Sequence, residues 1–178
     1  MSEPFVLSVP VEAADHVIGP AQARVTVVEY GDFECPNCKQ AAPALKQLAA
    51  KFGDDVRLVY RHFPLEAVHV HALHAAEAAE CAGAQGKFLP MHDLLFEHQN
   101  ELKANHLRQY AEHLELDLAR FNREMVGHLY LQRIRDHVRG GEESGVRATP
   151  TFFVNGKLAD VSFGVASLFD VVRIALKK

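Results

Sequence analysis

The sequence predicts an α/β fold in which a central mixed sheet is flanked by helices and an α-helical subdomain is inserted between two parts of the sheet. Three observations predict it. The first 65 residues contain two β-branched runs around a helical pattern, residues 66–144 contain amphipathic stretches without a convincing strand, and residues 145–178 return to strand chemistry before a final helix. We therefore expect 1–65 to hold an N-terminal arm and a β–α–β unit, 66–144 the helical insertion, and 145–178 a β–β–α completion.

Length and composition exclude several classes of protein. The chain has 178 residues, enough to bury a sizeable core without disulfide staples, and its three cysteines leave one unpaired. Nineteen Lys and Arg against 23 Asp and Glu give a net charge of −4, and no basic run is long enough to bind a phosphate backbone. We expect neither a nucleic-acid partner nor a membrane span, since no apolar run has the length to cross a bilayer.

Residues 1–23 are punctuated by prolines and weakly patterned, so we expect an arm lying on the domain, with a short edge strand at Phe5–Val9. The start lacks both the basic residues and the uninterrupted apolar stretch of a secretory signal. On this basis we expect a cytoplasmic protein, in a compartment where thiols are kept reduced. A leader removed ahead of this segment would make the expected compartment periplasmic.

The first β–α–β unit comes next. Residues 24–30 form a β-branched run that is typical of a strand buried on both faces. A helical pattern begins after Cys35 and ends at Gly53, and Pro43 is expected to kink that helix because proline cannot donate a backbone hydrogen bond. Residues 56–61 then supply a second strand, which we expect to lie parallel to the first after a right-handed crossover.

The rest of the chain predicts helices followed by a hairpin. The amphipathic stretches of the insertion lie at roughly 67–82, 87–100, 104–114, 117–126 and 128–143. Strand chemistry returns at Thr151–Val154, and the Asn155-Gly156 pair predicts a hairpin into a second strand near Leu158–Phe163. A closing helix is expected over Val165–Leu176. This order of elements is that of a thioredoxin-like domain interrupted by a helical subdomain.

The motif Cys35-Pro36-Asn37-Cys38 lies between a buried strand and a helix, the context in which two cysteines separated by two residues have redox meaning. Pro36 suits the first helical position, so Cys35 falls near the N-cap, where the free amides and the helix dipole favour its thiolate. Cys38 lies one turn further on, close enough for a disulfide. We expect Cys35 to attack and Cys38 to resolve.

The alternative for the same pair is half of a zinc site. Cys35 and Cys38 would then need two more ligands from the eleven histidines. Zinc ligands usually come in paired motifs, and neither a second Cys-x-x-Cys nor a suitably spaced histidine pair is obviously placed. We therefore expect no metal at the dithiol.

Two further positions could support thiol chemistry. Glu29 lies six residues before Cys35 within an apolar run, so a buried carboxylate could accept the proton of Cys38, although strand alternation alone leaves a solvent-facing Glu29 open. The Thr149-Pro150 bond is the place to look for a cis proline, since it lies just before the hairpin strands. If it is cis, the Thr149 backbone could pair with an extended substrate beside the sulfurs.

Residues 28–38 and 145–156 contain the segments VEYGDFECPNC and GVRATPTFFVNG, and with the helices between them they resemble the DsbA-like thioredoxin family over about residues 15–177. The resemblance implies a thioredoxin core with an inserted helical domain, a nucleophilic Cys35, a resolving Cys38, a buried acid at Glu29 and a cis bond at Pro150. Two differences from the periplasmic oxidants of that family are expected to matter: those oxidants typically carry a leader, and they have a His before the second cysteine, where this chain has Asn37.

Asn37 has a physical consequence. A neutral amide stabilises the Cys35 thiolate less than a cationic or strongly donating His would, and Asp32 and Glu34 add negative charge that Lys39 only partly opposes. We therefore expect Cys35 to be more basic, and the disulfide less oxidising, than in the strong periplasmic oxidants. The substrate is expected to contact the residues Pro36, Asn37, Thr149 and Pro150.

The remaining cysteine and the histidine-rich segment have simpler interpretations. Cys81 lies in an Ala-rich helical stretch, where a free cysteine commonly packs as a small hydrophobe, with redox sensing as the alternative. His71 and His74 could share a helical face as metal ligands. The favoured interpretation is that these two histidines, with His69 just before them, lie at the partly solvated start of a helix. His62 ends the second strand and is the histidine expected to influence Cys35.

Together these features predict a thiol–disulfide oxidoreductase without cofactors. It would exchange disulfides with cysteine-containing proteins or peptides through a Cys35 mixed disulfide, with glutathione or another thiol as the recycling partner. The alternative is a zinc-holding or chaperone-like binding protein in which the dithiol does not turn over. The sequence does not fix the direction of the reaction or the oligomeric state.

Overall fold

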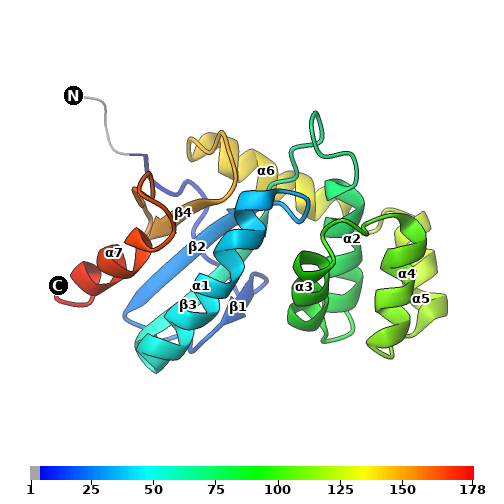
Figure 1. The fold of residues 1–178 in the computed structure, drawn as a ribbon, viewed down its shortest axis with the longest axis horizontal. Helices are drawn as coiled ribbons and strands as arrows, with labels where there is room; N and C mark the ends of the chain where they lie inside the picture. Colours follow the sequence, from blue (N-terminus) through cyan, green and yellow to red (C-terminus); the bar gives the residue numbers. More distant parts are fainter. Residues whose placement is uncertain (1–4) are drawn as a thin grey trace.

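The computed structural model describes residues 5–178, which fold as a sheet with helices on both faces and a helical lobe at one side (Figure 1). The elements in chain order are β1 (His16–Ile18), β2 (Val25–Gly31), α1 (Pro36–Phe52), a 3₁₀ turn (Gly53–Asp55), β3 (Val56–His62), α2 (Ala72–Gly83), α3 (Phe88–Glu97), α4 (Ala104–His113), α5 (Leu118–Val126), α6 (Leu131–Glu143), β4 (Thr151–Val154), β5 (Lys157–Leu158) and α7 (Ser167–Ala175). None of these helices combines the length and the apolar character needed to cross a bilayer.

The sheet is mixed, with its strands in the order β1-β3-β2-β4-β5. β2 and β3 pair in parallel from Val25 opposite Val56 to Gly31 opposite His62, so the carboxyl ends of both strands meet at one edge. The other three pairings, β1 with β3, β2 with β4 and β4 with β5, are antiparallel. The predicted α/β fold with a central mixed sheet is confirmed.

Alternation along β2 distributes its side chains between two cores. Val25 and Val27 pack against α1 and α7, whereas Val28 and Tyr30 face the other side of the sheet and join a cluster that includes Val138 of α6. Side chains two residues apart share a face of a strand, so Glu29 lies on the α1 side, beneath the start of that helix. The two faces of this strand are thus both covered, each by a different hydrophobic core.

Helices α2 to α5 build a third core next to the dithiol. Its buried members include an alanine-rich face of α2, Phe88, Met91 and Leu95 from α3, and the cysteines Cys35 and Cys38. In Figure 1 these four helices form the lobe beside the sheet, while α6 runs back across the sheet. Helix α6 therefore helps cover the sheet, although its sequence pattern resembles that of the preceding helices.

The structure corrects two of the expected strands. Within Phe5–Val9 there is a single bridge, Val6 opposite Lys157 of β5. The N-terminal segment instead forms the strand β1 at His16–Ile18, at the opposite edge of the sheet. The strand expected at Leu158–Phe163 ends at Leu158. The Asp160 side chain accepts the backbone N–H of Ser162 at 2.9 Å, and this local bond turns the chain away from the sheet.

Candidate active site

Cys35 is the N-cap of α1, as the sequence predicts. Its backbone is extended, with φ −77° and ψ 121°, and Pro36 begins the helix. Its carbonyl accepts the N–H groups of Cys38 and Lys39 at 3.1 and 3.2 Å. Cys35 is only 5% exposed and Cys38 is fully buried, so the first sulfur alone lies near the surface.

The surroundings of Cys35 stabilise its thiolate. A hydrogen bond from the Cys38 thiol is the largest cause, and the backbone amides of Cys38 and Asn37 add to it, so the Cys35 pKa falls to about 5 although burial opposes the fall. Amide donors of this kind are the free N–H groups that a helix N-terminus provides. At neutral pH Cys35 is therefore mostly the nucleophilic anion.

Cys38 is shifted in the opposite direction. Burial is the main reason why its pKa rises far above the ordinary thiol value, and the bond to Cys35 and the negative charge of Glu29 raise it further. The Asp32 N–H, which donates to Cys38 Sγ at 3.5 Å, only partly offsets these effects. The two sulfurs thus differ in both exposure and charge.

Glu29 lies on β2 with 5% of its surface exposed. Burial first, and then the charge of Cys35, raise its pKa to about 8. Its Oε1 has no hydrogen-bond partner among residues 5–178, and the side chain faces a mostly apolar cavity of about 190 Å³ between α1, α3 and the sheet, which Tyr60 and His92 also line. The structure therefore places a buried carboxyl group on the dithiol side of the sheet, not at a solvent-facing position.

The Thr149–Pro150 peptide bond is cis. The loop that contains it precedes β4, the strand that pairs with β2. This arrangement brings the Thr149 carbonyl to 3.3 Å from Cys35 Sγ, close enough to accept a hydrogen bond from the thiol when Cys35 is protonated. Residues 114 positions apart in the sequence thus meet at the reactive sulfur.

Gln99, just after α3, is a contact of the dithiol that the sequence did not reveal. Its Nε2 donates to the carbonyl oxygens of Phe33 and Cys35, each at 2.8 Å. These bonds join the helical lobe to the segment that carries Cys35. A single glutamine in a polar stretch gives no sequence signal for such a contact.

Asp32 also has more partners than its position after a strand suggests. It is buried, its Oδ2 accepts the Leu65 N–H and contacts His69 Nδ1, both at 2.8 Å, and its Oδ1 accepts the Glu34 N–H at 2.7 Å. Lys39, expected to offset the acidic charge near Cys35, instead donates to the Glu97 carbonyl at 3.2 Å. Asp32 therefore organises the loop beside the dithiol.

The other candidate residues lie apart from the reactive sulfurs or at their edge. Pro36 and Asn37 are exposed beside Cys35. His62 is buried and its Nε2 contacts Glu80 Oε1 at 2.8 Å, so its nearest polar partner is a carboxylate and not a thiol. Cys81 is fully buried, and burial raises its pKa to about 12, as expected of a thiol that serves in packing.

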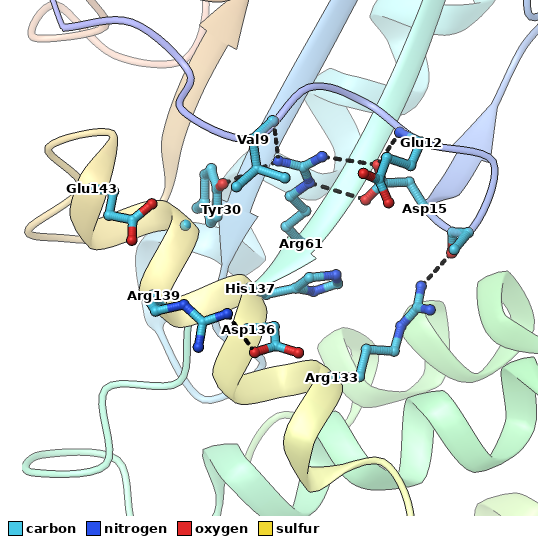
Figure 2. Close-up of a pocket in the computed structure, with 12 residues that line it drawn as sticks. Val9, Glu12, Asp15, Tyr30, Arg61, Arg133, Asp136, His137, Arg139 and Glu143 are labelled. Carbon is cyan, nitrogen blue, oxygen red and sulfur yellow. Dashed lines mark hydrogen bonds and ion pairs between the residues drawn. The ribbon is translucent and has the colours of Figure 1, made fainter.

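A second concave region, of about 620 Å³, lies between the N-terminal arm and α6 (Figure 2). Its guanidinium groups already have partners: Arg61 bonds Asp15 at 2.9 and 3.0 Å, and Arg139 bonds Asp136 at 2.8 Å. Arg61 also donates to the carbonyls of Val9 and Pro10, which fastens the arm to the sheet. This region is held together by internal ion pairs.

Comparisons with known proteins match both the fold and the sequence. The family model described as Thioredoxin matches residues 12–170. BdbD from Bacillus subtilis has the same fold, with a TM-score of 0.87 over 99% of this chain and all of that chain at 21% identity. A thioredoxin-like oxidoreductase from Silicibacter pomeroyi, 28% identical, gives a TM-score of 0.82 over 94% of this chain and 95% of that chain.

The curated relatives have a different kind of name. The Na⁺/H⁺ antiporter NhaA 1 of Salinispora arenicola is 51% identical over 170 residues, which are 95% of this chain but 26% of that protein. The chain spans about a quarter of the length of the curated relatives it matches. Because the Thioredoxin model covers most of its length and the solved structures match its fold, the chain belongs to the thioredoxin family and has a DsbA-like fold.

Proposed function

We propose that this protein is a thiol–disulfide oxidoreductase that works through a mixed disulfide on Cys35. The opposite pKa shifts of the two sulfurs carry the proposal. The pKa of Cys35 is lowered to about 5, while the pKa of Cys38 is raised far above the ordinary thiol value. An attacking sulfur must be a thiolate, and a resolving sulfur should stay protonated until the mixed disulfide exists. Neighbouring sulfurs in these two states meet both requirements.

In the reducing direction the reaction consists of two successive thiol–disulfide exchanges. The Cys35 thiolate attacks one sulfur of a substrate disulfide, and the other substrate sulfur leaves as a thiolate. Glu29, when ionised, takes the proton of Cys38, and the Cys38 sulfur then attacks Cys35 Sγ and releases the second substrate thiolate. The pKa of about 8 for Glu29 suits this transfer, since a proton acceptor works best when its pKa lies near the working pH.

The substrates are cysteine-containing proteins or peptides. The exposed Pro36 and Asn37 and the Thr149–Pro150 loop surround Cys35, and a carbonyl 3.3 Å from its sulfur suits an extended chain lying beside the cis proline. Glutathione or another small thiol would regenerate the dithiol. Neither step requires a metal or an organic cofactor.

The disulfide is proposed to be milder than that of DsbA. A Cys35 pKa of about 5 lies between about 7 for thioredoxin and about 3.5 for DsbA, and a more basic nucleophile goes with a less oxidising disulfide. We place the activity in the cytoplasm, where such a dithiol would act as a reductant, with the periplasm as the alternative. Cell fractionation combined with trapping of the thiol state in each fraction would separate the two.

The decisive experiment traps the mixed disulfide. Wild-type protein should reduce insulin in the presence of a thiol donor, Cys35→Ser should be inactive, and Cys38→Ser should accumulate a covalent adduct with substrate that a reductant releases. Cys81→Ser is the matched control, because that thiol is buried away from solvent, and it should keep wild-type turnover. Stoichiometric zinc bound by Cys35 and Cys38, with no thiol-dependent turnover, would instead favour the zinc-holding or chaperone-like binding protein.

A further inference from the structure

Three buried or nearly buried side chains converge where the sheet meets the helical lobe, outside the dithiol site. They are His16 of β1, His62 at the end of β3, and Glu80 of α2. The Nε2 atoms of both histidines lie 2.8 Å from the same oxygen, Glu80 Oε1, and the three atoms are all within 4.8 Å of one another. Among residues 5–178 this is the one group of three or more such side chains with that spacing, and neither Cys35 nor Cys38 belongs to it.

Strand pairing and ring stacking hold the two imidazoles in place. His16 lies opposite Tyr60 in the antiparallel β1–β3 pair, so these two side chains share a face of the sheet. His62 is two residues after Tyr60 on β3, so the rings of both histidines project from that same face. The His16 ring stacks on Phe88 with 3.4 Å between centroids and an interplanar angle of 6°. The His62 ring stacks on His137 at 5.6 Å and 19°. The histidines are thus oriented by packing, independently of any ligand.

The cluster supplies the donor types that transition metals bind. These metals take neutral imidazoles and ionised carboxylates as ligands, and the three side chains bring two imidazoles and the Glu80 carboxylate together.

Arg133 of α6 contacts the other oxygen of the same carboxylate. Its Nε lies 3.1 Å from Glu80 Oε2, and its NH2 group donates to the Ala14 carbonyl, an interaction drawn in Figure 2. The guanidinium therefore balances part of the carboxylate charge from the Oε2 side, while Oε1 is directed at the two imidazoles.

We propose that His16, His62 and Glu80 form a binding site for a transition-metal ion, with Zn²⁺ as the best match. Two imidazole nitrogens and one carboxylate oxygen suit zinc and disfavour Ca²⁺ and Mg²⁺, which prefer oxygen ligands. Ligand atoms on a tetrahedral zinc lie about 3.3 Å apart, so the 2.8 Å contacts must open by roughly 0.5 Å. A bound ion would tie β1 and β3 to the helical lobe through α2.

The test uses oxidised protein, because the Cys35–Cys38 disulfide removes the competing thiolates, and it carries Cys81→Ser so that no free thiol remains. Zinc is titrated calorimetrically, and X-ray absorption of the zinc-loaded sample identifies the ligand atoms. We expect one ion per chain, a first shell with imidazole nitrogen and no sulfur, and a higher melting temperature with zinc. Absence of binding, or sulfur in the shell, would overturn the proposal without affecting the proposed redox function.

Matched histidine variants locate the ion. His16→Ala removes a ligand from the three-residue edge strand β1 and should weaken zinc binding at least tenfold, whereas His113→Ala, at an exposed position of α4, should leave it unchanged. Equal affinities for the two variants would overturn the assignment. If His16→Ala does not fold, the absorption spectrum of the protein with His16 intact still decides, since the proposal requires two imidazoles and a carboxylate on the ion.

Discussion

Glu29 and Glu80 are two carboxyl groups buried to nearly the same depth, with 5% and 3% of their surfaces exposed. Glu29 has its pKa raised to about 8, whereas the pKa of Glu80 lies well below the ordinary carboxyl value. Burial opposes ionisation in both cases and therefore cannot explain the difference. The neighbours explain it: Glu29 faces apolar side chains and the dithiol, whereas Glu80 faces two imidazoles and the guanidinium of Arg133.

The comparison separates two uses of a buried acid. An unpartnered carboxyl group near pH 7 exchanges its proton readily, and so it can serve a reaction in which a neighbouring thiol must lose one. A carboxylate held by several donors stays ionised and joins the elements that carry those donors. Under the proposed function Glu29, beside the dithiol, is of the first kind. Glu80 is of the second kind and lies where four elements meet, namely α2, β1, β3 and α6.

The largest effect is expected for Glu80→Gln. Loss of the charge leaves Arg133 and the two imidazoles without their anion, and breaking a buried ion pair typically costs about 3–5 kcal/mol. Since the Arg133 side chain is 29% exposed, we expect a loss near the lower end, about 3 kcal/mol, in the free energy of unfolding measured by urea denaturation at pH 7. A loss below about 1 kcal/mol would show that the histidine contacts are not a stabilising network.

The pH dependence of that variant sharpens the comparison. The folded pKa of Glu80 lies below the value of 4.5 for a free side chain, so its stabilisation is fully present above about pH 4.5 and is lost as pH falls towards the folded pKa. The difference between wild type and Glu80→Gln should therefore shrink on acidification below pH 4.5. A difference that stays constant down to pH 3 would argue against an ionised Glu80 as its source.

Glu29→Gln should act with the opposite sign. The folded pKa of about 8 lies above the free value, so Glu29 destabilises the fold increasingly as pH rises from about 4.5 to 8. In the oxidised protein, where the Cys35 charge is absent, we expect the variant to be more stable by roughly 2 kcal/mol at pH 8, where wild type bears the cost of ionisation. At pH 4 the two proteins should be equally stable, and equality at pH 8 as well would contradict a raised pKa.

The same substitution should slow the resolving step. Without a proton acceptor near Cys38, the attack on the Cys35 mixed disulfide should fall by roughly a hundredfold, the usual size of general-base assistance. Stopped-flow release of a thiol from a preformed mixed disulfide measures this step directly. The first attack by Cys35 should be nearly unchanged, so a uniform slowing of both steps would indicate a structural effect and not proton transfer.

Features set by neighbouring residues could be predicted from the sequence, whereas contacts between distant elements could not. The N-cap position of Cys35 is local, because Pro36 and the preceding strand determine it within a few residues. The partners of Glu80 come from β1, β3 and α6, and those of Cys35 include Gln99 from the helical lobe. Such contacts depend on how distant elements pack, which local patterns do not record.

Intermediate cases lie between these extremes. The apolar run around Glu29 predicts a strand. The raised pKa of Glu29 depends on its burial without a hydrogen-bond partner for Oε1 among residues 5–178, which only the packed structure reveals. Similarly, the Asn155-Gly156 hairpin is predicted by its turn residues, whereas the early end of β5 at Leu158 depends on the bond between Asp160 and Ser162.

The smallest effect is expected for Tyr60→Phe, and it tests whether Glu29 truly lacks a partner. The Tyr60 hydroxyl is buried without a hydrogen-bond partner among residues 5–178, and burial, followed by the charge of Glu29, raises its pKa. Removing an unsatisfied buried hydroxyl should change the free energy of unfolding by no more than about 0.5 kcal/mol, towards greater stability. The pH profile of stability, which reports the Glu29 titration near pH 8, should keep its position.

A loss above about 1 kcal/mol, with the Glu29 titration moved to higher pH, would identify the Tyr60 hydroxyl as a donor to the carboxylate, because removing such a donor disfavours the charged form. Glu29 would then be a weakly partnered acid, and the contrast with Glu80 would be one of degree.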